Sequence, residues 1–191
     1  FKIREEAEVS GAGKTVRLSV EPYGGGIYRS WLDRPLSVAG RVLVRTAAGV
    51  EPRLVNVDRD LLVIPSVAIH MDRTVNKGAA LDPAVDLLPL LGMEDKGAFR
   101  RLIAAEAGVE EADLVTTELF LYPRMRGTCV GAAGEFLCAP RLDDLQCVYG
   151  CLQGFLAAGT GESMPVLCVL HTEAVGSGTW QGADSTFLTD V

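Results

Sequence analysis

The sequence has no apolar stretch of the roughly 18 to 20 residues that a membrane-spanning helix needs. Its first five residues, FKIRE, show no signal-peptide pattern. It also has no basic run, and its net charge is −7. These absences exclude a membrane protein and argue against nucleic acid as a partner. They predict a soluble, cytoplasmic protein.

The cysteine and glycine patterns argue against a disulfide framework, a zinc knuckle and a phosphate-binding loop. The five cysteines are odd in number and form no C-x-x-C pair, so neither a disulfide framework nor a zinc knuckle is expected, and we predict that they are small buried packing residues. They are Cys129, Cys138, Cys147, Cys151 and Cys168. The glycines at 24–26 precede no Lys-Ser/Thr pair and open no helix, which excludes a phosphate loop. They predict a turn with positive φ packed beside Trp31.

The first half of the chain has the pattern of strands. With 191 residues and 48% hydrophobic content, the chain can bury a core. Apolar alternation interrupted by glycine and proline predicts strands at residues 15–20, 36–46, 53–57 and 61–64. We expect an antiparallel β module, followed by a loop at 76–78, an apolar turn at 87–91 and a helix over 98–107 that Gly108 stops.

From residue 118 onward the pattern becomes that of an α/β fold. A strand is expected at 118–122, then a helix, then a buried parallel strand at 166–170. The helix carries Leu145, Tyr149, Leu152 and Leu156 on one face, and Asp143 lies at its N-terminus. Glu173 follows the 166–170 strand, at the sheet edge where ligands of α/β proteins gather. Two such carboxylates are typical of half of a two-metal hydrolase site. From spacing alone, however, a helix N-cap is the better interpretation of Asp143, and a structural residue the better interpretation of His70.

Four blocks in order along the chain carry a family resemblance. The first is VEPYGGGIYRSWLDR at 20–34 with AGRV at 39–42, and the second is IPSVAIH at 64–70 with Val75 and Asn76. The third runs from Glu135 to Leu145, and the fourth is VGS at 175–177 with QGADS at 181–185. Together they resemble the aspartyl aminopeptidase family of dinuclear-zinc exopeptidases.

The resemblance implies chemistry for particular residues. Asp143 would bridge two Zn²⁺ ions per subunit. For Asp144, its place in the first turn of a helix instead favours a partner of the helix dipole over a ligand. Glu173 would be the general base that takes a proton from the attacking water. The expected substrate is a peptide that loses single N-terminal residues, acidic ones among them. His70 would reach the active site of a neighbouring subunit and stabilise the oxyanion there.

The resemblance also implies an architecture. The fold class is α/β plus a β-rich insert: pieces of a zinc-exopeptidase α/β domain at 1–15 and 119–191 flank an antiparallel dimerisation module at 16–118. Self-association as a dimer, and then as a twelve-subunit shell, is expected. The chain lacks an initiator methionine and the family's other ligand motifs, so we expect an internal segment of a longer protein, inactive when isolated.

The sequence departs from the family beside the expected base. Where the family has two consecutive glutamates, this chain has Glu173 followed by Ala174, which has no donor atom for a metal. His171 stands where the family usually has aspartate, and a metal-ligand role for it is the weaker alternative. The second hypothesis for function is therefore a non-catalytic assembly module or an inactive homologue with a degraded metal site.

Overall fold

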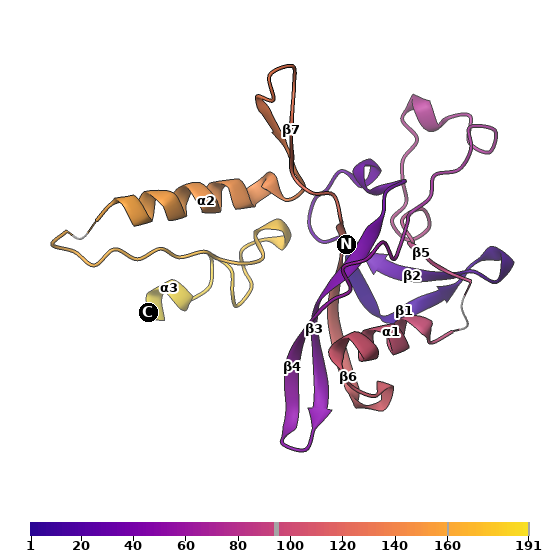
Figure 1. Ribbon diagram of the computed structural model, residues 1–191, viewed down its shortest axis with the longest axis horizontal. Coiled ribbons are helices and arrows are strands. Elements are labelled where there is room, and N and C mark those ends of the chain that lie inside the picture. The colour runs from indigo at the N-terminus through magenta and orange to yellow at the C-terminus, as the bar shows by residue number, and fades with distance from the viewer. Residues whose placement is uncertain (94–95, 160, 191) are drawn as a thin grey trace. The chain divides into compact units, whose positions relative to one another are not determined.

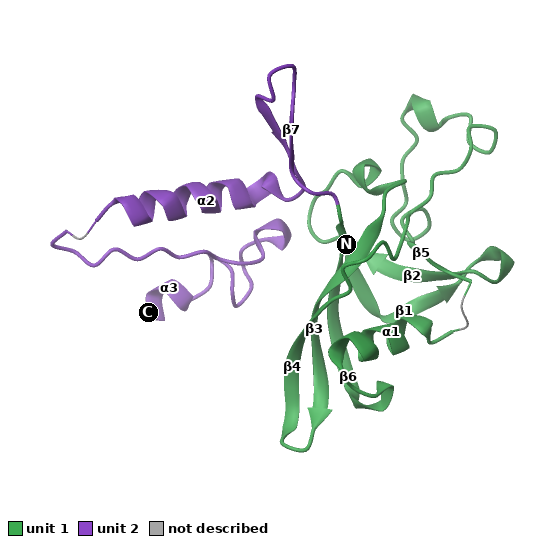
Figure 2. Ribbon diagram, viewed as in Figure 1, with its two compact units in different colours: residues 1–124 green, residues 125–191 purple. Residues whose placement is uncertain are grey.

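A computed structural model describes residues 1–191 except 94, 95, 160 and 191. The chain divides into two compact units, Phe1–Arg124 (unit 1) and Met125–Val191 (unit 2), which Figure 2 colours separately. In the part of the chain that the structure describes, no helix combines the length and the apolar character of a membrane span.

Unit 1 is built on a six-stranded antiparallel sheet with the strand order β4-β3-β6-β1-β2-β5 (Figure 1). The strands are β1 (Lys2–Ser10), β2 (Val16–Glu21), β3 (Leu36–Thr46), β4 (Gly49–Asn56), β5 (Leu90–Gly92) and β6 (Leu114–Pro123). β3 and β4 form a hairpin, whereas β6 returns from far along the chain to pair with both β3 and β1. The short 3-10 helices are η1 (Ala12–Lys14), η2 (Tyr28–Trp31), η3 (Val75–Lys77) and η4 (Glu111–Asp113).

One face of this sheet carries the hydrophobic core. Alternate strand residues such as Val42, Val44 and Leu119 point to it and are at most 1% exposed. Helix α1 (Ala98–Ala107) contributes buried Phe99, Ile103, Ala104 and Ala107, the i, i+4, i+8 spacing of an amphipathic helix. The Glu8 carboxylate accepts hydrogen bonds from the N–H groups of Gly97 and Phe99, which satisfies donors that the first turn leaves free. Gly108 ends the helix in the left-handed conformation, at φ 67°.

The opposite face of the sheet is open. Leu54 of β4 pairs with Arg41 of β3, which pairs with Glu118 of β6, so these three side chains lie side by side. Arg41 and Glu118 form an ion pair at 2.6 Å, and Leu54 is 87% exposed. β4 pairs only with β3 among the described residues, and Pro52, which has no N–H to donate, lies on this edge strand.

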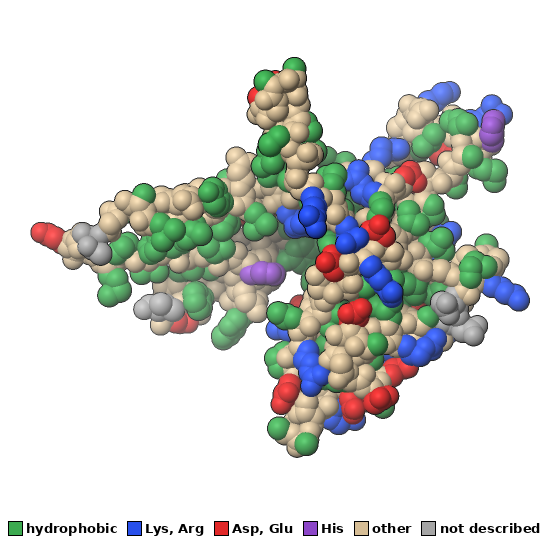
Figure 3. Space-filling view, in the orientation of Figure 1, with side chains coloured by type: hydrophobic (Ala, Val, Ile, Leu, Met, Phe, Trp, Pro, Cys, Tyr) green, Lys and Arg blue, Asp and Glu red, His purple; other side chains and the backbone are tan. Residues whose placement is uncertain are grey.

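Unit 2 contains the hairpin of β7 (Thr128–Val130) and β8 (Phe136–Cys138), helix α2 (Leu142–Ala157), the 3-10 helix η5 (Glu173–Val175) and the short α3 (Phe187–Asp190). Its apolar side chains are largely exposed, and Figure 3 shows hydrophobic groups on its surface. The buried hydrophobic cluster of the described residues lies entirely in unit 1. The described residues of unit 2 therefore form no hydrophobic core of their own.

Most predicted elements of unit 1 are confirmed. β3 and α1 have the predicted bounds, and β2 differs by one residue at each end. β4 begins four residues before the predicted strand and ends one residue before its predicted end, whereas β6 extends beyond the prediction at both ends. The predicted strand at 61–64 forms only isolated bridges, at Leu62 and Val63. Gly24 has a positive φ of 68°, as predicted, although Trp31 packs on Phe1. The sequence analysis missed β1, which pairs within the sheet of unit 1.

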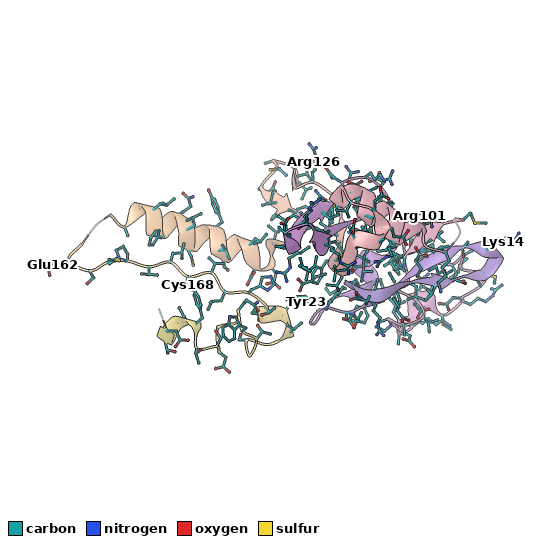
Figure 4. All side chains as sticks on the ribbon, turned by 90° about the horizontal axis from the view of Figure 1, so that it is seen from below. Lys14, Tyr23, Arg101, Arg126, Glu162 and Cys168 are labelled. Carbon is teal, nitrogen blue, oxygen red and sulfur yellow. The ribbon has the colours of Figure 1, made fainter. Side chains whose placement is uncertain are left out.

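Two predictions for unit 2 are wrong. Residues 166–170 form no strand and Val166 is 75% exposed, because the described residues provide no neighbouring strand to accept and donate backbone hydrogen bonds. All five cysteines are exposed rather than buried, since they lie in the unit that has no core. Figure 4 shows Cys168 on the extended segment that follows α2. The mixed α/β class is confirmed, whereas the predicted domain limits at 15/16 and 118/119 stay a prediction.

The buried core of unit 1 leads to a stability prediction with a matched control. Ile103→Ala should lower the free energy of unfolding by about 2–5 kcal/mol, because it leaves a cavity at a side chain with 0% exposure. Ile27→Ala removes the same atoms from a side chain that is 77% exposed and should change stability by less than about 0.5 kcal/mol. Denaturant unfolding monitored by circular dichroism measures both, and equal effects would contradict this description of the core.

Candidate active site

Asp143 lies at the irregular start of helix α2. Arg141 is the N-cap residue, in the left-handed conformation at φ 63°. Asp143 (φ −81°, ψ 113°) and Asp144 (φ −117°, ψ 16°) are not helical, and the peptide bond between them is cis. No side-chain hydrogen bond caps this helix in the described part of the chain. Asp143 is therefore not the N-cap residue, and its exposed carboxylate makes no capping hydrogen bond to the helix.

Both acidic side chains nevertheless belong to the first turn of α2, where negative charge is favourable beside the positive end of the helix dipole. The predicted apolar face of the helix is present, and it is exposed: Leu145 by 56%, Tyr149 by 64%, Leu152 by 39% and Leu156 by 66%. The predicted helix with Leu145, Tyr149, Leu152 and Leu156 on one face is thus confirmed, and its regular part begins after Asp144. Among the described residues of unit 2, none covers this face closely enough to bury it.

Glu173 begins η5 in a loop that is held by its own backbone. The His171 N–H donates to the carbonyl of Gln181 at 2.9 Å, and the Asp184 N–H donates to that of Ser177 at 3.1 Å. Glycine is required at position 182, where two parts of the loop come close together, because a Cβ there would lie 2.0 Å from the backbone oxygen of Ser177. The hydroxyls of Thr172 and Thr179 also form a hydrogen bond. The loop therefore fixes the backbone at Glu173 while leaving the carboxylate exposed.

This loop also contains the two departures from the family pattern. Ala174 follows Glu173 within η5 and has only a methyl group to offer. His171 uses its backbone N–H to close the loop, and its side chain is exposed. A ligand role for His171 stays a weaker prediction.

His70 belongs to unit 1 and lies in the long loop between β4 and β5. Figure 1 shows this loop and η3 projecting from the sheet of unit 1. Its neighbours are also exposed, Val67 by 61%, Ile69 by 47% and Met71 by 79%. His70 is therefore exposed, and it is not a buried structural histidine.

The described residues do not form a metal site by themselves. Among the described residues, no three histidine, cysteine, aspartate or glutamate side chains come together in a way that could hold a metal ion. Carboxylate oxygen is a suitable zinc ligand, but zinc sites in proteins use three or four protein donors. Asp143 therefore offers a donor atom that suits zinc, but no complete set of donors surrounds it in the described part of the chain.

A cavity of about 470 Å³ lies elsewhere, between β1 and α1 in unit 1. Its lining includes Glu5, Glu8, Lys96 and Arg100. Glu8 already caps α1, and Glu5 accepts a hydrogen bond of 2.9 Å from the Thr116 hydroxyl. Two of the carboxylates of this cavity, those of Glu5 and Glu8, therefore have structural partners, and none of the predicted site residues is among its lining residues.

Comparison with known proteins identifies the family. The chain matches the family model described as "Aminopeptidase I zinc metalloprotease (M18)" over residues 1–191. It is 39% identical to the probable M18 family aminopeptidase 2 of Clostridium acetobutylicum, over 100% of this chain and 46% of that protein. The corresponding protein of Azotobacter vinelandii is 38% identical, over 92% of this chain and 42% of its own length.

Solved structures agree with this match. An Ape4 chain solved in complex with Nbr1 superposes with a TM-score of 0.86 at 30% identity, covering 99% of this chain and 41% of that chain. The S. cerevisiae mApe1 dodecamer gives a TM-score of 0.77 at 26% identity, covering 99% of this chain and 44% of that chain. The fold is that of metallopeptidases with an α/β architecture. The chain belongs to the M18 family of zinc aminopeptidases, which confirms the resemblance seen in the four sequence blocks, and it spans about half the length of these relatives.

Proposed function

We propose that this chain is a segment of a zinc aminopeptidase that removes single residues, acidic ones among them, from the N-terminus of peptides. The observation that carries the proposal is the family match over the whole chain, together with identities near 39% to aminopeptidase relatives. Because the chain spans about 46% of such a relative, the complete site requires residues outside it.

Each site residue has a proposed task. Asp143, at the irregular start of α2, would hold zinc, two ions per subunit being the family arrangement. Bound zinc supplies Lewis-acid polarisation of the scissile carbonyl and activation of water. Glu173 would accept a proton from the attacking water and deliver it to the leaving amine, which requires its carboxylate within about 3 Å of that water. The self-closed loop around η5 supports this role, because a general base must be held in place.

His70 would act on the neighbouring subunit. An imidazole that donates a hydrogen bond to the tetrahedral oxyanion stabilises charge that develops only in the transition state. Its position in an exposed loop, away from the core of its own unit, supports a role outside that unit. Assembly and activity would then be coupled.

Self-association is the second part of the proposal. We propose that residues 16–118 form a dimerisation module between the catalytic-domain pieces 1–15 and 119–191. The open sheet face with Leu54, and the mApe1 dodecamer among the structural neighbours, support assembly of this chain into dimers and larger shells. Two-fold interfaces are self-complementary and commonly contain exposed apolar groups of this kind.

A non-catalytic assembly module is the alternative function. Ala174 favours it, because the carboxylate expected after Glu173 is missing and one metal would lose a ligand. Metal analysis and peptidase assays on the full-length protein distinguish the two. Zinc bound to each subunit with release of N-terminal residues, abolished by a chelator, supports the enzyme. An intact assembly without zinc or turnover favours the alternative.

The open face gives a prediction for assembly. Leu54→Lys should weaken self-association of the full-length protein by about tenfold or more, because it places a charge in an apolar contact. Ile27→Lys, also on an exposed side chain but away from the sheet, should leave the association constant nearly unchanged. Sedimentation velocity over a concentration series measures both, and an unaltered dimer in Leu54→Lys would remove this face from the interface.

A further inference from the structure

One short segment contacts both limbs of the loop that contains His70. We define the His70 loop as residues 65–79. The η2 segment is defined as residues 28–34, which lie within the connection between β2 and β3. The His70 loop lies on the surface and contains few buried groups. Without specific contacts such a loop samples many conformations, so the contacts that it does make decide where His70 is held.

The first limb is held by Asp33. Its carboxylate accepts a hydrogen bond of 2.7 Å from the Ser66 N–H, and its own N–H donates to the carbonyl of Ile64 at 2.9 Å. Ile64 is fully buried, so the root of the loop is fixed to the core. Hydrogen bonds from the hydroxyl and the N–H of Ser66 lower the pKa of the Asp33 carboxyl. The ionised carboxylate therefore makes a charge-assisted bond four residues before His70.

The second limb is held by Arg29. Its guanidinium donates to the carbonyl of Ala79 at 3.0 Å, across a separation of 50 residues in the sequence. Between the two limbs, the Asp72 carboxylate accepts hydrogen bonds from the N–H and hydroxyl of Thr74, at 2.9 and 2.7 Å. These Thr74 bonds, and to a smaller extent the charge of Arg29, lower the pKa of the Asp72 carboxyl. The loop is thus braced at both limbs and at its tip.

The η2 segment is itself anchored. The ring of Phe1 packs edge-on against Trp31, with ring centroids 4.9 Å apart, and also contacts Tyr28 at 5.8 Å. Phe1 is 8% exposed and belongs to the hydrophobic core. Arg29 and Asp33 therefore project from a segment fixed by aromatic packing, which makes them suitable to hold a loop that has little packing of its own.

We propose that Arg29 and Asp33 are positioning residues that clamp the two limbs of the His70 loop and so orient His70. The inference rests on the proposed function of His70 for its catalytic consequence. The clamp itself rests on hydrogen bonds within unit 1. It also gives a physical role to Arg29 and Asp33 of the run YRSWLDR in the first sequence block.

Amide hydrogen exchange of the full-length protein tests the clamp directly. Asp33→Ala and Arg29→Ala should each raise exchange rates in residues 65–79 by roughly tenfold or more, the factor for loss of one hydrogen bond to a charged group. Asp33→Asn retains an acceptor oxygen and should restore most of the protection. Arg101→Ala, which removes an exposed arginine from α1, is the matched control for Arg29→Ala and should leave the loop unchanged. Unchanged exchange in Asp33→Ala and Arg29→Ala would overturn the clamp.

Steady-state kinetics on the same variants tests the positioning role. Asp33→Ala should lower kcat about tenfold with little change in KM, because an oxyanion contact acts on the transition state. The same substitution made in a His70→Ala background should then have no further effect. An equal loss in both backgrounds, or no loss in Asp33→Ala when His70→Ala is impaired, would overturn the positioning role. If exchange rises but neither Asp33→Ala nor His70→Ala alters kcat, the proposed role of His70 fails and the clamp stands.

Discussion

Glu173→Gln in the full-length protein is expected to lower turnover about a hundredfold or more while leaving its zinc content unchanged. Glutamine has nearly the shape of glutamate and can accept a hydrogen bond, but it cannot take a proton from water. The self-closed loop around η5 does not depend on the Glu173 side chain, since its hydrogen bonds join the backbone groups of residues 171–185. The substitution therefore removes the base and preserves the loop.

Glu162→Gln is the matched control for this experiment. Glu162 is also an exposed glutamate of unit 2, and Figure 4 shows it at the turn between α2 and the extended segment that contains Cys168. Its replacement should leave turnover within about twofold of the original, as expected for a surface position outside the site. Steady-state kinetics with an N-terminal aspartyl substrate, combined with elemental analysis, measures both variants. If Glu173→Gln turned over normally, we would abandon the catalytic assignment of Glu173.

The sequence pattern predicted two kinds of element well: strands that pair with a neighbour close in the sequence, and helices that bury one apolar face. β3 shows apolar alternation and pairs with its hairpin partner β4, and α1 has the 3.6-residue spacing and ends at Gly108. β1 was missed because its run KIREEAEVS is rich in glutamate, and only Ile3 in it is fully buried. The weak alternation of Ile3, Ala7 and Val9 was the signal for it.

The incorrect prediction of a strand at 166–170 has the opposite cause to the missed β1: the local pattern is strong, but the strand does not form. Its apolar, β-branched residues have a high strand propensity, but a strand forms only when neighbouring strands satisfy its backbone groups. Those neighbours are absent from the described residues of this chain. The exposed cysteines have the same explanation, because burial depends on a covering layer that local sequence does not show.

Candidate site residues were predictable by type and by family pattern, but their supporting structure was not. The irregular backbone at Asp143 and Asp144 leaves no local signal in a sequence that otherwise predicts a helix start. The bonds of Asp33 to Ser66 and of Arg29 to Ala79 span 33 and 50 residues. Contacts over such distances depend on the tertiary fold, so only the structure could connect the first sequence block to the His70 loop.

Zinc affinity should respond in opposite directions to two substitutions in unit 2. Asp143→Ala in the full-length protein is expected to weaken zinc binding by more than about a hundredfold, because groups that merely support a metal ligand already contribute about ten- to a hundredfold. Asp144→Ala is the matched control: it removes the adjacent carboxylate, which we assign to the helix dipole, and should alter zinc binding little. Equal losses in the two variants would contradict the assignment of Asp143 as the ligand.

Ala174→Glu should strengthen zinc binding instead. It places a carboxylate at the position where the family has its second glutamate, next to Glu173 in η5. The loop backbone around it is held by hydrogen bonds that the new side chain does not disturb, so the added oxygen donors can complete a depleted metal site. Titration with a competing chelator measures the affinity, and elemental analysis gives the number of ions per subunit. If neither quantity changes in Ala174→Glu, the site is not depleted at this position, and the absent glutamate no longer favours the non-catalytic alternative.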